Sequence, residues 1–213
     1  MDIKYRLLYF DLRGRAEVVR LVLNYIGVPF EDAVVSRDTW PEIKRAMPLG
    51  QLPVLWESGE RSDTRIPQTM AILRHLARAH GLYGASEREH TLSDVLAETI
   101  VDARGRFAPV AYRPNYLKDE AINAHYVESE LPESLDRLAK LMRHSTVPEA
   151  GYFVTAVPTW ADFVAFDFLD MQLQIWPACL ESYPAMLGFV ERIQSLPTLR
   201  DYLADRRPSD FRP

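Results

Sequence analysis

A tyrosine stands where the first apolar segment of the chain ends. Tyr9 follows the apolar run from Tyr5 to Leu8 and precedes Phe10-Asp11-Leu12-Arg13-Gly14-Arg15. The run predicts a buried strand, and the apolar spacing after it predicts a helix that ends at Gly27. A phenol at the exit of a strand can hydrogen-bond a group docked above the sheet. If that group is a thiolate, the hydrogen bond favours the charged form and lowers the thiol pKa.

A proline interrupts a later apolar run. Leu52-Pro53-Val54-Leu55-Trp56 has the composition of a strand, but proline removes a donor from the strand ladder and normally occurs at an edge or a strand start. A cis Leu52-Pro53 bond would leave the N–H and C=O of Leu52 facing outward, where an extended peptide can pair with them. An ordinary strand-starting proline is the alternative.

Two further segments suit an anion. Gln68 and Thr69 open a predicted helix, and a helix N-terminus offers unpaired amides and a favourable dipole to a carboxylate. Simple capping by Thr69 is the alternative. Trp40 and Lys44 fall four residues apart on one face of a short helix that we expect Asp38 to cap.

The composition is typical of a globular protein. The 213 residues are 47% hydrophobic and 26% charged, enough for one large domain or two modest ones. No stretch approaches the length of a membrane span, and the N-terminus lacks the pattern of a signal peptide. The net charge is -5 and the arginines are dispersed, which argues against a nucleic-acid partner. We therefore expect a cytoplasmic protein that does not bind membranes.

The chain has one cysteine and five scattered histidines. The single thiol, Cys179, excludes an internal disulfide and a CxxC redox or zinc motif, and it is expected to be a small buried residue. The histidines show no HxxxH or HExxH spacing and are expected at surfaces or helix ends. No metal site is predicted.

The order of predicted elements divides the chain in two. Strands and helices alternate up to Gly81, whereas the pattern from about Glu87 stays helical, with one apolar stripe running from Ile122 to Met142. We therefore predict an α/β domain over residues 1–81, a linker over 82–88 and an all-α domain over 89–213.

In their order, these motifs resemble the cytosolic glutathione transferases, and the tyrosine-type sigma and pi classes look closest. The resemblance rests on Tyr9-Phe10-x-x-Arg13-Gly14-Arg15, Trp40-Pro-Glu-Ile-Lys44, Pro48-Leu-Gly-Gln51-Leu52-Pro53-Val54-Leu55 and Gln68-Thr69-x-Ala71-Ile72. It covers nearly the whole chain. It implies a thioredoxin-like N-terminal domain followed by a C-terminal helical bundle domain.

Carried over residue by residue, the resemblance assigns a site for glutathione as co-substrate. It implies that Tyr9 donates its hydroxyl to the glutathione sulfur and that Arg15 points its guanidinium toward the same region. Leu52 would pair through its backbone with the cysteinyl unit, ahead of a cis Pro53. The glycyl end would be held by Trp40, Lys44 and Gln51, and the γ-glutamyl carboxylate by Gln68 and Thr69.

Three acidic residues, Asp94, Glu98 and Asp102, share one face of a predicted helix because they are spaced four apart. Such a stripe is unfavourable without cations opposite, and Arg74 and Arg78 offer them. The family implies a homodimer in which Arg74 of one copy meets Asp94 or Glu98 of the other. Asp102 would reach the γ-glutamyl amine in the second copy's site. A solvated acidic face is the alternative for Asp94 and Glu98.

A carboxylate in an apolar helix invites a catalytic interpretation, but Asp162 has a simpler one. It follows Thr159 by three residues, which is the spacing of a reciprocal capping box and is similar to the box of the resembled family. We therefore assign Asp162 to folding.

The pocket for the second substrate is predicted by position alone. Its members are apolar and are equally good core residues: Phe10, Leu12, Phe107, Val110, Val164 and Phe168. They favour a mainly apolar electrophile. Vertebrate sigma enzymes that make prostaglandin D carry a tryptophan in the region where this chain has Ala108-Pro109-Val110, and this departure argues against prostaglandin isomerisation. A longer hairpin at Ser58 to Thr64, and Thr69 where the family usually has serine, are smaller departures.

The prediction is a homodimeric, cytoplasmic glutathione transferase of detoxification, which activates the glutathione thiol as thiolate for attack on small apolar electrophiles. A glutathione-dependent isomerase or peroxidase would share the same peptide site. A noncatalytic ligand carrier or structural protein of the same fold is a third possibility, against which the complete set of site residues weighs.

Overall fold

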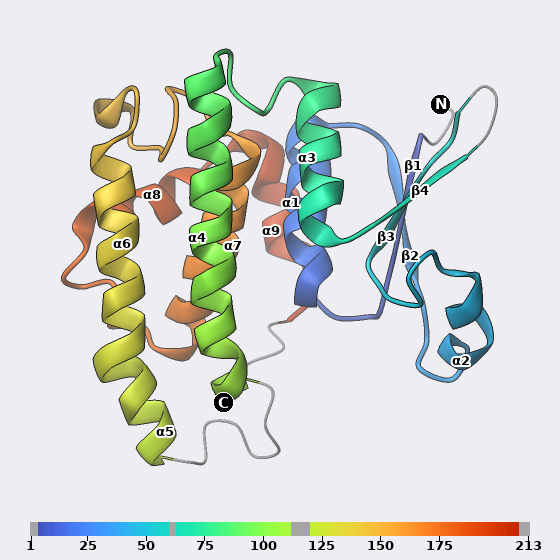
Figure 1. Cartoon of the computed structure of the whole chain (residues 1–213), viewed down its shortest axis with the longest axis horizontal. Coiled ribbons are helices and arrows are strands. Elements are labelled where there is room, and N and C mark those ends of the chain that lie inside the picture. Colours follow the sequence, from blue (N-terminus) through green and yellow to red (C-terminus); the bar gives the residue numbers. More distant parts are fainter. Residues whose placement is uncertain (1–3, 60–62, 112–119, 209–213) are drawn as a thin grey trace. The chain divides into compact units, whose positions relative to one another are not determined.

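The computed structural model describes residues 4–59, 63–111 and 120–208. Within these residues the chain forms two compact units. The first ends at Gly81 and also includes the segment that begins at Ser195, whereas the second runs from Leu82 to Gln194. Figure 1 labels the elements of both units and colours them in chain order.

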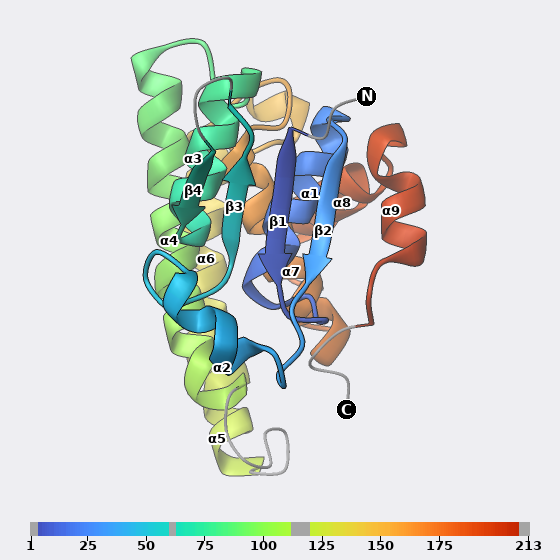
Figure 2. The ribbon, with the colours of Figure 1, turned by 90° about the vertical axis from the view of Figure 1, so that its right-hand side faces the viewer.

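A four-stranded mixed sheet forms the centre of the first unit. Its strands are β1 (Tyr5–Tyr9), β2 (Phe30–Val34), β3 (Val54–Glu57) and β4 (Thr64–Pro67), and Figure 2 shows them in the order β2-β1-β3-β4. β1 runs parallel to β2, with Tyr9 beside Val34, and the other two pairs are antiparallel. Tyr9 is therefore the last residue of an inner strand, as the sequence predicted.

Two helices pack on one face of this sheet, which Figure 1 shows side-on. The 3-10 turn η1 (Gly14–Ala16) leads into α1 (Glu17–Ile26), and α3 (Thr69–His80) follows β4. Both helices bury their apolar stripes and end at the predicted glycines, Gly27 and Gly81. The arrangement confirms the predicted thioredoxin-like domain.

A short helical segment lies between β2 and β3. It consists of α2 (Trp40–Ile43) and the 3-10 turn η2 (Lys44–Ala46), and its apolar residues join a cluster with Leu8 and Val54 of the sheet. The expectation that Asp38 caps this helix is wrong. Thr39 precedes the helix, and its N–H donates to the hydroxyl of Ser36 at 3.1 Å, so a serine three residues before Thr39 organises the turn.

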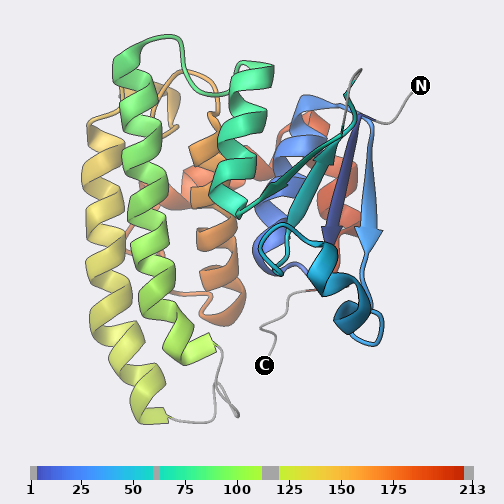
Figure 3. The ribbon, with the colours of Figure 1, turned by 45° about the vertical axis from the view of Figure 1, so that its right-hand side comes forward.

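The second unit is built from helices alone among its described residues. They are α4 (Glu87–Ala111), α5 (Glu120–His125), the π-helical turn η3 (Tyr126–Glu130), α6 (Leu131–Arg143), the 3-10 turn η4 (Pro148–Ala150), α7 (Trp160–Ile175) and α8 (Pro184–Gln194). Figure 3 shows α4 and α6 side by side and antiparallel, and α7 packs against both α4 and α8. The predicted all-helical domain is confirmed. No helix in the described part of the chain is long and apolar enough to cross a membrane.

One predicted apolar stripe proves to be three elements. The helical stripe predicted from Ile122 to Met142 divides into α5, η3 and α6. Pro132 lacks the N–H that a continuous α-helix would donate to the carbonyl four residues earlier, and the wider π turn precedes this position.

The capping box at the start of α7 is present. One carboxylate oxygen of Asp162 accepts the N–H and the hydroxyl of Thr159 at 2.8 and 2.7 Å, and the other accepts the N–H of Phe153 at 2.8 Å. Complete burial raises the pKa of Asp162 to about 6, although these hydrogen bonds oppose the shift. Asp162 is thus a structural residue, as predicted.

The last described segment packs against α1 and the sheet. It contains the 3-10 turn η5 (Pro197–Leu199) and α9 (Arg200–Asp205), and it belongs to the first unit. The Tyr202 hydroxyl donates to Glu17 of α1 at 2.9 Å, and Arg207 donates to Asp32 of β2 at 2.6 Å. The polar contacts of this segment are thus with α1 and the sheet, and the predicted all-α domain boundary at residue 213 stays a prediction.

Replacing Asp162 by alanine should destabilise the protein without touching the site around Tyr9. Asp162→Ala leaves the buried amides of Thr159 and Phe153 without acceptors, so we expect the free energy of unfolding to fall by about 2 kcal/mol or more. Urea denaturation measures this change. Glu191→Ala, which removes an exposed carboxylate from α8, is the matched control. Equal stability of the two variants would contradict the capping role.

Candidate active site

The hydroxyl of Tyr9 is held by a backbone amide. The N–H of Arg15 donates to the Tyr9 hydroxyl oxygen at 3.1 Å, and the Tyr9 side chain is only 8% exposed. Its ring contacts that of Phe10 at 5.7 Å between centroids. A phenol whose oxygen accepts a hydrogen bond in this way can also donate through its own O–H. The geometry suits a phenol that stabilises a bound anion.

Gly14 makes this hydrogen bond possible, a role that was not predicted from the sequence. Its φ is +42°, and a Cβ at this position would lie 2.6 Å from the Tyr9 hydroxyl oxygen and 2.5 Å from Cδ1 of Leu12. No side chain fits at such distances. The glycine that precedes the helix within Arg13-Gly14-Arg15 was the signal that could have identified this position.

The backbone of Arg15 connects the phenol to α3. Its N–H bonds Tyr9, and its carbonyl accepts the Thr69 hydroxyl at 3.2 Å. The Arg15 side chain is exposed. The structure thus brings Tyr9, Arg15 and Thr69 together, but the contact with the phenol is made by the amide of Arg15 and not by its guanidinium.

The start of α3 has the features of an anion site. Gln68 precedes the helix with a φ of 73°, the only positive φ among the described residues other than glycine, and no side chain caps the helix there. Non-glycine residues in this conformation cost energy and cluster at functional sites. The alternative that Thr69 caps the helix is wrong, since its hydroxyl donates to Arg15 and helix α3 begins at Thr69 itself.

The Leu52-Pro53 peptide bond is cis, as predicted. Pro53 is buried and immediately precedes β3. Among the described hydrogen bonds of the chain, none uses the backbone amide or carbonyl of Leu52. These groups can therefore pair with an extended peptide that lies along this edge of the unit.

The predicted glycyl-binding residues lie on the connection from β2 to β3. Trp40 begins α2 and packs edge-on against Phe10 at 5.7 Å, and Lys44 begins η2. The aliphatic part of Lys44 passes within 3.7 Å of the Cβ position of Gly50, next to the exposed Gln51. The shared glycyl-binding role of Trp40, Lys44 and Gln51 stays a prediction.

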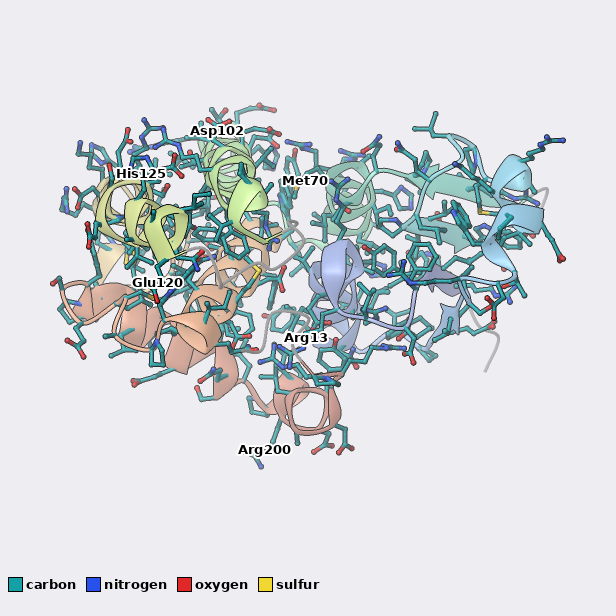
Figure 4. All side chains as sticks on the ribbon, turned by 90° about the horizontal axis from the view of Figure 1, so that it is seen from below. Arg13, Met70, Asp102, Glu120, His125 and Arg200 are labelled. Atoms are coloured by element: carbon teal, nitrogen blue, oxygen red, sulfur yellow. The ribbon has the colours of Figure 1, made fainter. Side chains whose placement is uncertain are left out.

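The acidic stripe lies on α4, where Figure 4 labels Asp102. Asp102 and Glu98 are exposed, and Asp94 accepts the Tyr83 hydroxyl at 3.0 Å. Asp94 is thus not a purely solvated residue. The cross-copy roles of this stripe and of Arg74 and Arg78 on α3 remain predictions.

The six predicted pocket residues fall into two groups. Phe10 and Leu12 are partly exposed in the loop after β1. The other four are buried on the helices of the second unit: Phe107 and Val110 on α4, Val164 and Phe168 on α7. Phe107 also contacts Tyr126 and Trp176 ring to ring. Their contact with a second substrate stays a prediction.

No thiol of the chain is suited to act as a nucleophile. Cys179 is partly buried, and burial raises its pKa to about 11, so the thiol is protonated at neutral pH. Among the described residues, no three His, Cys, Asp or Glu side chains gather as metal ligands.

Two family models match the chain. The model described as glutathione S-transferase, N-terminal domain, covers residues 6–78, and that of the C-terminal domain covers residues 101–206. The chain therefore belongs to the glutathione S-transferase family. The prediction that it is a glutathione transferase is confirmed.

Relatives of two classes are similar over nearly the whole chain. Glutathione S-transferase P of Caenorhabditis elegans is 37% identical over 94% of this chain and 92% of its own. The sigma class enzyme of Fasciola hepatica has a TM-score of 0.87 at 29% identity, over 98% of this chain and 99% of its own. Hematopoietic prostaglandin D synthase of Gallus gallus is 34% identical over 95% and 96% of the two chains. The predicted likeness to the sigma and pi classes is thus confirmed.

A methyl group at Gly14 should displace the phenol of Tyr9. We expect Gly14→Ala to lower the rate of glutathione conjugation to 1-chloro-2,4-dinitrobenzene by about tenfold or more, since small misplacements of reacting groups are costly. Gly105→Ala is the control, because a Cβ at Gly105 meets nothing within 4 Å. Circular dichroism verifies that both variants fold. A folded Gly14→Ala with full activity would show that the close approach has no functional role.

Proposed function

We propose that this transferase binds glutathione as thiolate and directs its sulfur at small apolar electrophiles. The observation that carries the proposal is the hydrogen bond from the Arg15 amide to the Tyr9 hydroxyl. A free thiol has a pKa near 8.5, and lowering it by about two units needs roughly 2.7 kcal/mol of preference for the anion. A buried phenol whose oxygen already accepts a bond can contribute much of this preference.

The tripeptide binds in an extended form along the first unit. Leu52 pairs with the cysteinyl unit through its backbone, just ahead of Pro53. Trp40, Lys44 and Gln51 hold the glycyl carboxylate, and the N-terminus of α3, with Gln68 and Thr69, takes the γ-glutamyl carboxylate. The absence of a described backbone partner for Leu52 and the positive φ of Gln68 support these assignments.

Arg15 acts mainly through its backbone in this proposal. Its amide orients the Tyr9 hydroxyl, and its carbonyl accepts from Thr69, so that one residue ties the sulfur site to the carboxylate site. Its exposed guanidinium adds positive charge near the thiolate.

The electrophile that the thiolate attacks is a small apolar molecule. The six predicted pocket residues are assigned to contact it. A glutathione-dependent isomerase is the second candidate function, because the chain is related to a prostaglandin D synthase of Gallus gallus. The segment Ala108-Pro109-Val110 argues against prostaglandin as its substrate, since the tryptophan of the vertebrate enzymes is missing there. Glutathione-dependent peroxide reduction would use the same thiolate.

The working form is a cytoplasmic homodimer that serves detoxification. Arg74 and Arg78 of one copy face the acidic residues Asp94 and Glu98 of the other, and Asp102 reaches the γ-glutamyl amine across the dimer. The exposure of Glu98 and Asp102 supports these pairings. The net charge of -5 is compatible with a soluble dimer that avoids nucleic acids.

Retention on immobilised glutathione followed by a panel of acceptors tests the function. We expect the wild type to be retained and to conjugate apolar aromatic electrophiles. No retention would favour the noncatalytic carrier, and retention with peroxide reduction or isomerisation but no conjugation would favour the second candidates.

A matched pair of variants sharpens this test. Lys44→Ala should weaken glutathione binding by about fivefold, because an exposed charge-assisted hydrogen bond is worth about 1 kcal/mol. Arg45→Ala removes the neighbouring exposed cation and should bind as the wild type does. Equal losses in both variants would indicate a diffuse charge effect in place of the assigned contact.

A further inference from the structure

A buried arginine hydrogen-bonds the loop that carries the Arg15 amide to Tyr9. Arg20 of α1 is 1% exposed, and its Nη1 donates to the carbonyls of Leu12 and Arg13 at 3.1 and 3.2 Å. Its guanidinium lies 5.9 Å from the centre of the Tyr9 ring. Arg20 therefore contacts both the loop and the phenol that the loop serves.

Arg20 depends in turn on Asp32 of β2. The Nε of Arg20 donates to Oδ2 of Asp32 at 2.9 Å, and the same oxygen accepts from Nη1 of Arg207 at 2.6 Å. One carboxylate oxygen thus joins an arginine of α1 to an arginine of the C-terminal segment. Because these charges are largely withdrawn from water, each needs its partner to remain in place.

Arg207 also binds the loop directly, at two further points. Its Nε donates to Oδ1 of Asp11 at 2.7 Å, and its carbonyl accepts from Nε of Arg13 at 2.5 Å. Asp11 and Arg13 lie on either side of Leu12 in the loop between Tyr9 and η1. Arg207 thus bonds the loop on both sides of Leu12. It lies about 195 residues further along the chain.

A second ion pair anchors the same C-terminal segment. Glu17 of α1 is 1% exposed, accepts the Tyr202 hydroxyl at 2.9 Å and lies 3.7 Å from Arg206 and 3.6 Å from Arg20. Figure 4 shows Arg200, at the start of α9, pointing away from α1. Arg206 and Arg207 thus contact α1 and β2, whereas the side chain of Arg200 points away from α1.

We infer that Arg207 is a positioning residue for the sulfur site. It holds the loop 10–15 through Asp11, Arg13 and the shared Asp32, and it thereby sets the hydrogen bond between the Arg15 amide and the Tyr9 hydroxyl. The inference rests on the proposed function, since it assigns Arg207 an effect on the thiolate that Tyr9 stabilises.

The pH at which enzyme-bound glutathione ionises is the decisive readout. Arg207→Ala should raise this midpoint, because a misplaced Tyr9 hydroxyl stabilises the thiolate less well. The value of kcat at neutral pH should fall by roughly threefold to tenfold, which is the effect expected when about one hydrogen bond to the anion is lost. KM for glutathione should change by less than about twofold, because the carboxylate contacts are elsewhere. The lost kcat should return at higher pH.

Three variants separate positioning from simple stabilisation. Arg207→Lys keeps one charged contact and should recover part of the shift, and Asp11→Asn, at a carboxylate that is 73% exposed, should give a smaller shift in the same direction without a folding defect. Arg200→Ala should leave midpoint, kcat and melting temperature unchanged.

An Arg207→Ala or Asp11→Asn protein that melts earlier but ionises glutathione at the wild-type midpoint would overturn the inference. If Arg207→Ala fails to fold, the Asp11→Asn midpoint alone decides. Failure of the proposed function is distinguishable, because the wild type would then show no bound thiolate at all.

Discussion

The direction of one hydrogen bond constrains the chemistry of this chain. A backbone N–H can only donate, so the Tyr9 oxygen must accept the bond from the Arg15 amide at 3.1 Å. A phenol in that state directs its own proton to a second partner, and linked hydrogen bonds strengthen one another in a buried site. Tyr9 is thereby prepared to stabilise an anion, and the partly buried Cys179, with its pKa raised to about 11, leaves the thiol to be supplied by the bound tripeptide.

Several distant parts of the first unit maintain this bond. The absence of a side chain at Gly14 lets the loop approach the phenol, and the Thr69 hydroxyl fixes the carbonyl of Arg15. Arg20 holds two further carbonyls of the loop, and Arg207 holds its side chains. The burial of charges in this network is costly unless every partner is present, which favours one loop conformation over its alternatives. The position of the Tyr9 hydroxyl is thus fixed by residues spread over α1, α3 and the C-terminal segment.

The features predicted from the sequence were those with a local signal. Tyr9 at a strand exit and the Thr159–Asp162 box follow from neighbours in the chain, whereas the cis Pro53 was implied by the family resemblance. The structure contains all three. The motif order also identified the family. Capping by Asp38 was wrong, because Ser36 competes for the same turn.

The remaining features depend on contacts between distant residues. Nothing local in the sequence pairs Thr69 with Arg15, or Arg207 with Asp11, since 54 and 196 residues separate them. The close approach at Gly14 arises only once the loop folds back onto Tyr9. The positive φ of Gln68 is likewise set by its surroundings, because glutamine has no intrinsic preference for it.

The most direct measurement is the ultraviolet absorbance of enzyme-bound glutathione thiolate, titrated with pH in the wild type and in Tyr9→Phe. The account predicts that Tyr9→Phe still binds glutathione but ionises it about two units higher, close to the pKa of a free thiol. Tyr183→Phe, which removes a hydroxyl from the second unit, should titrate as the wild type does. The same midpoint in Tyr9→Phe and the wild type would contradict the central claim.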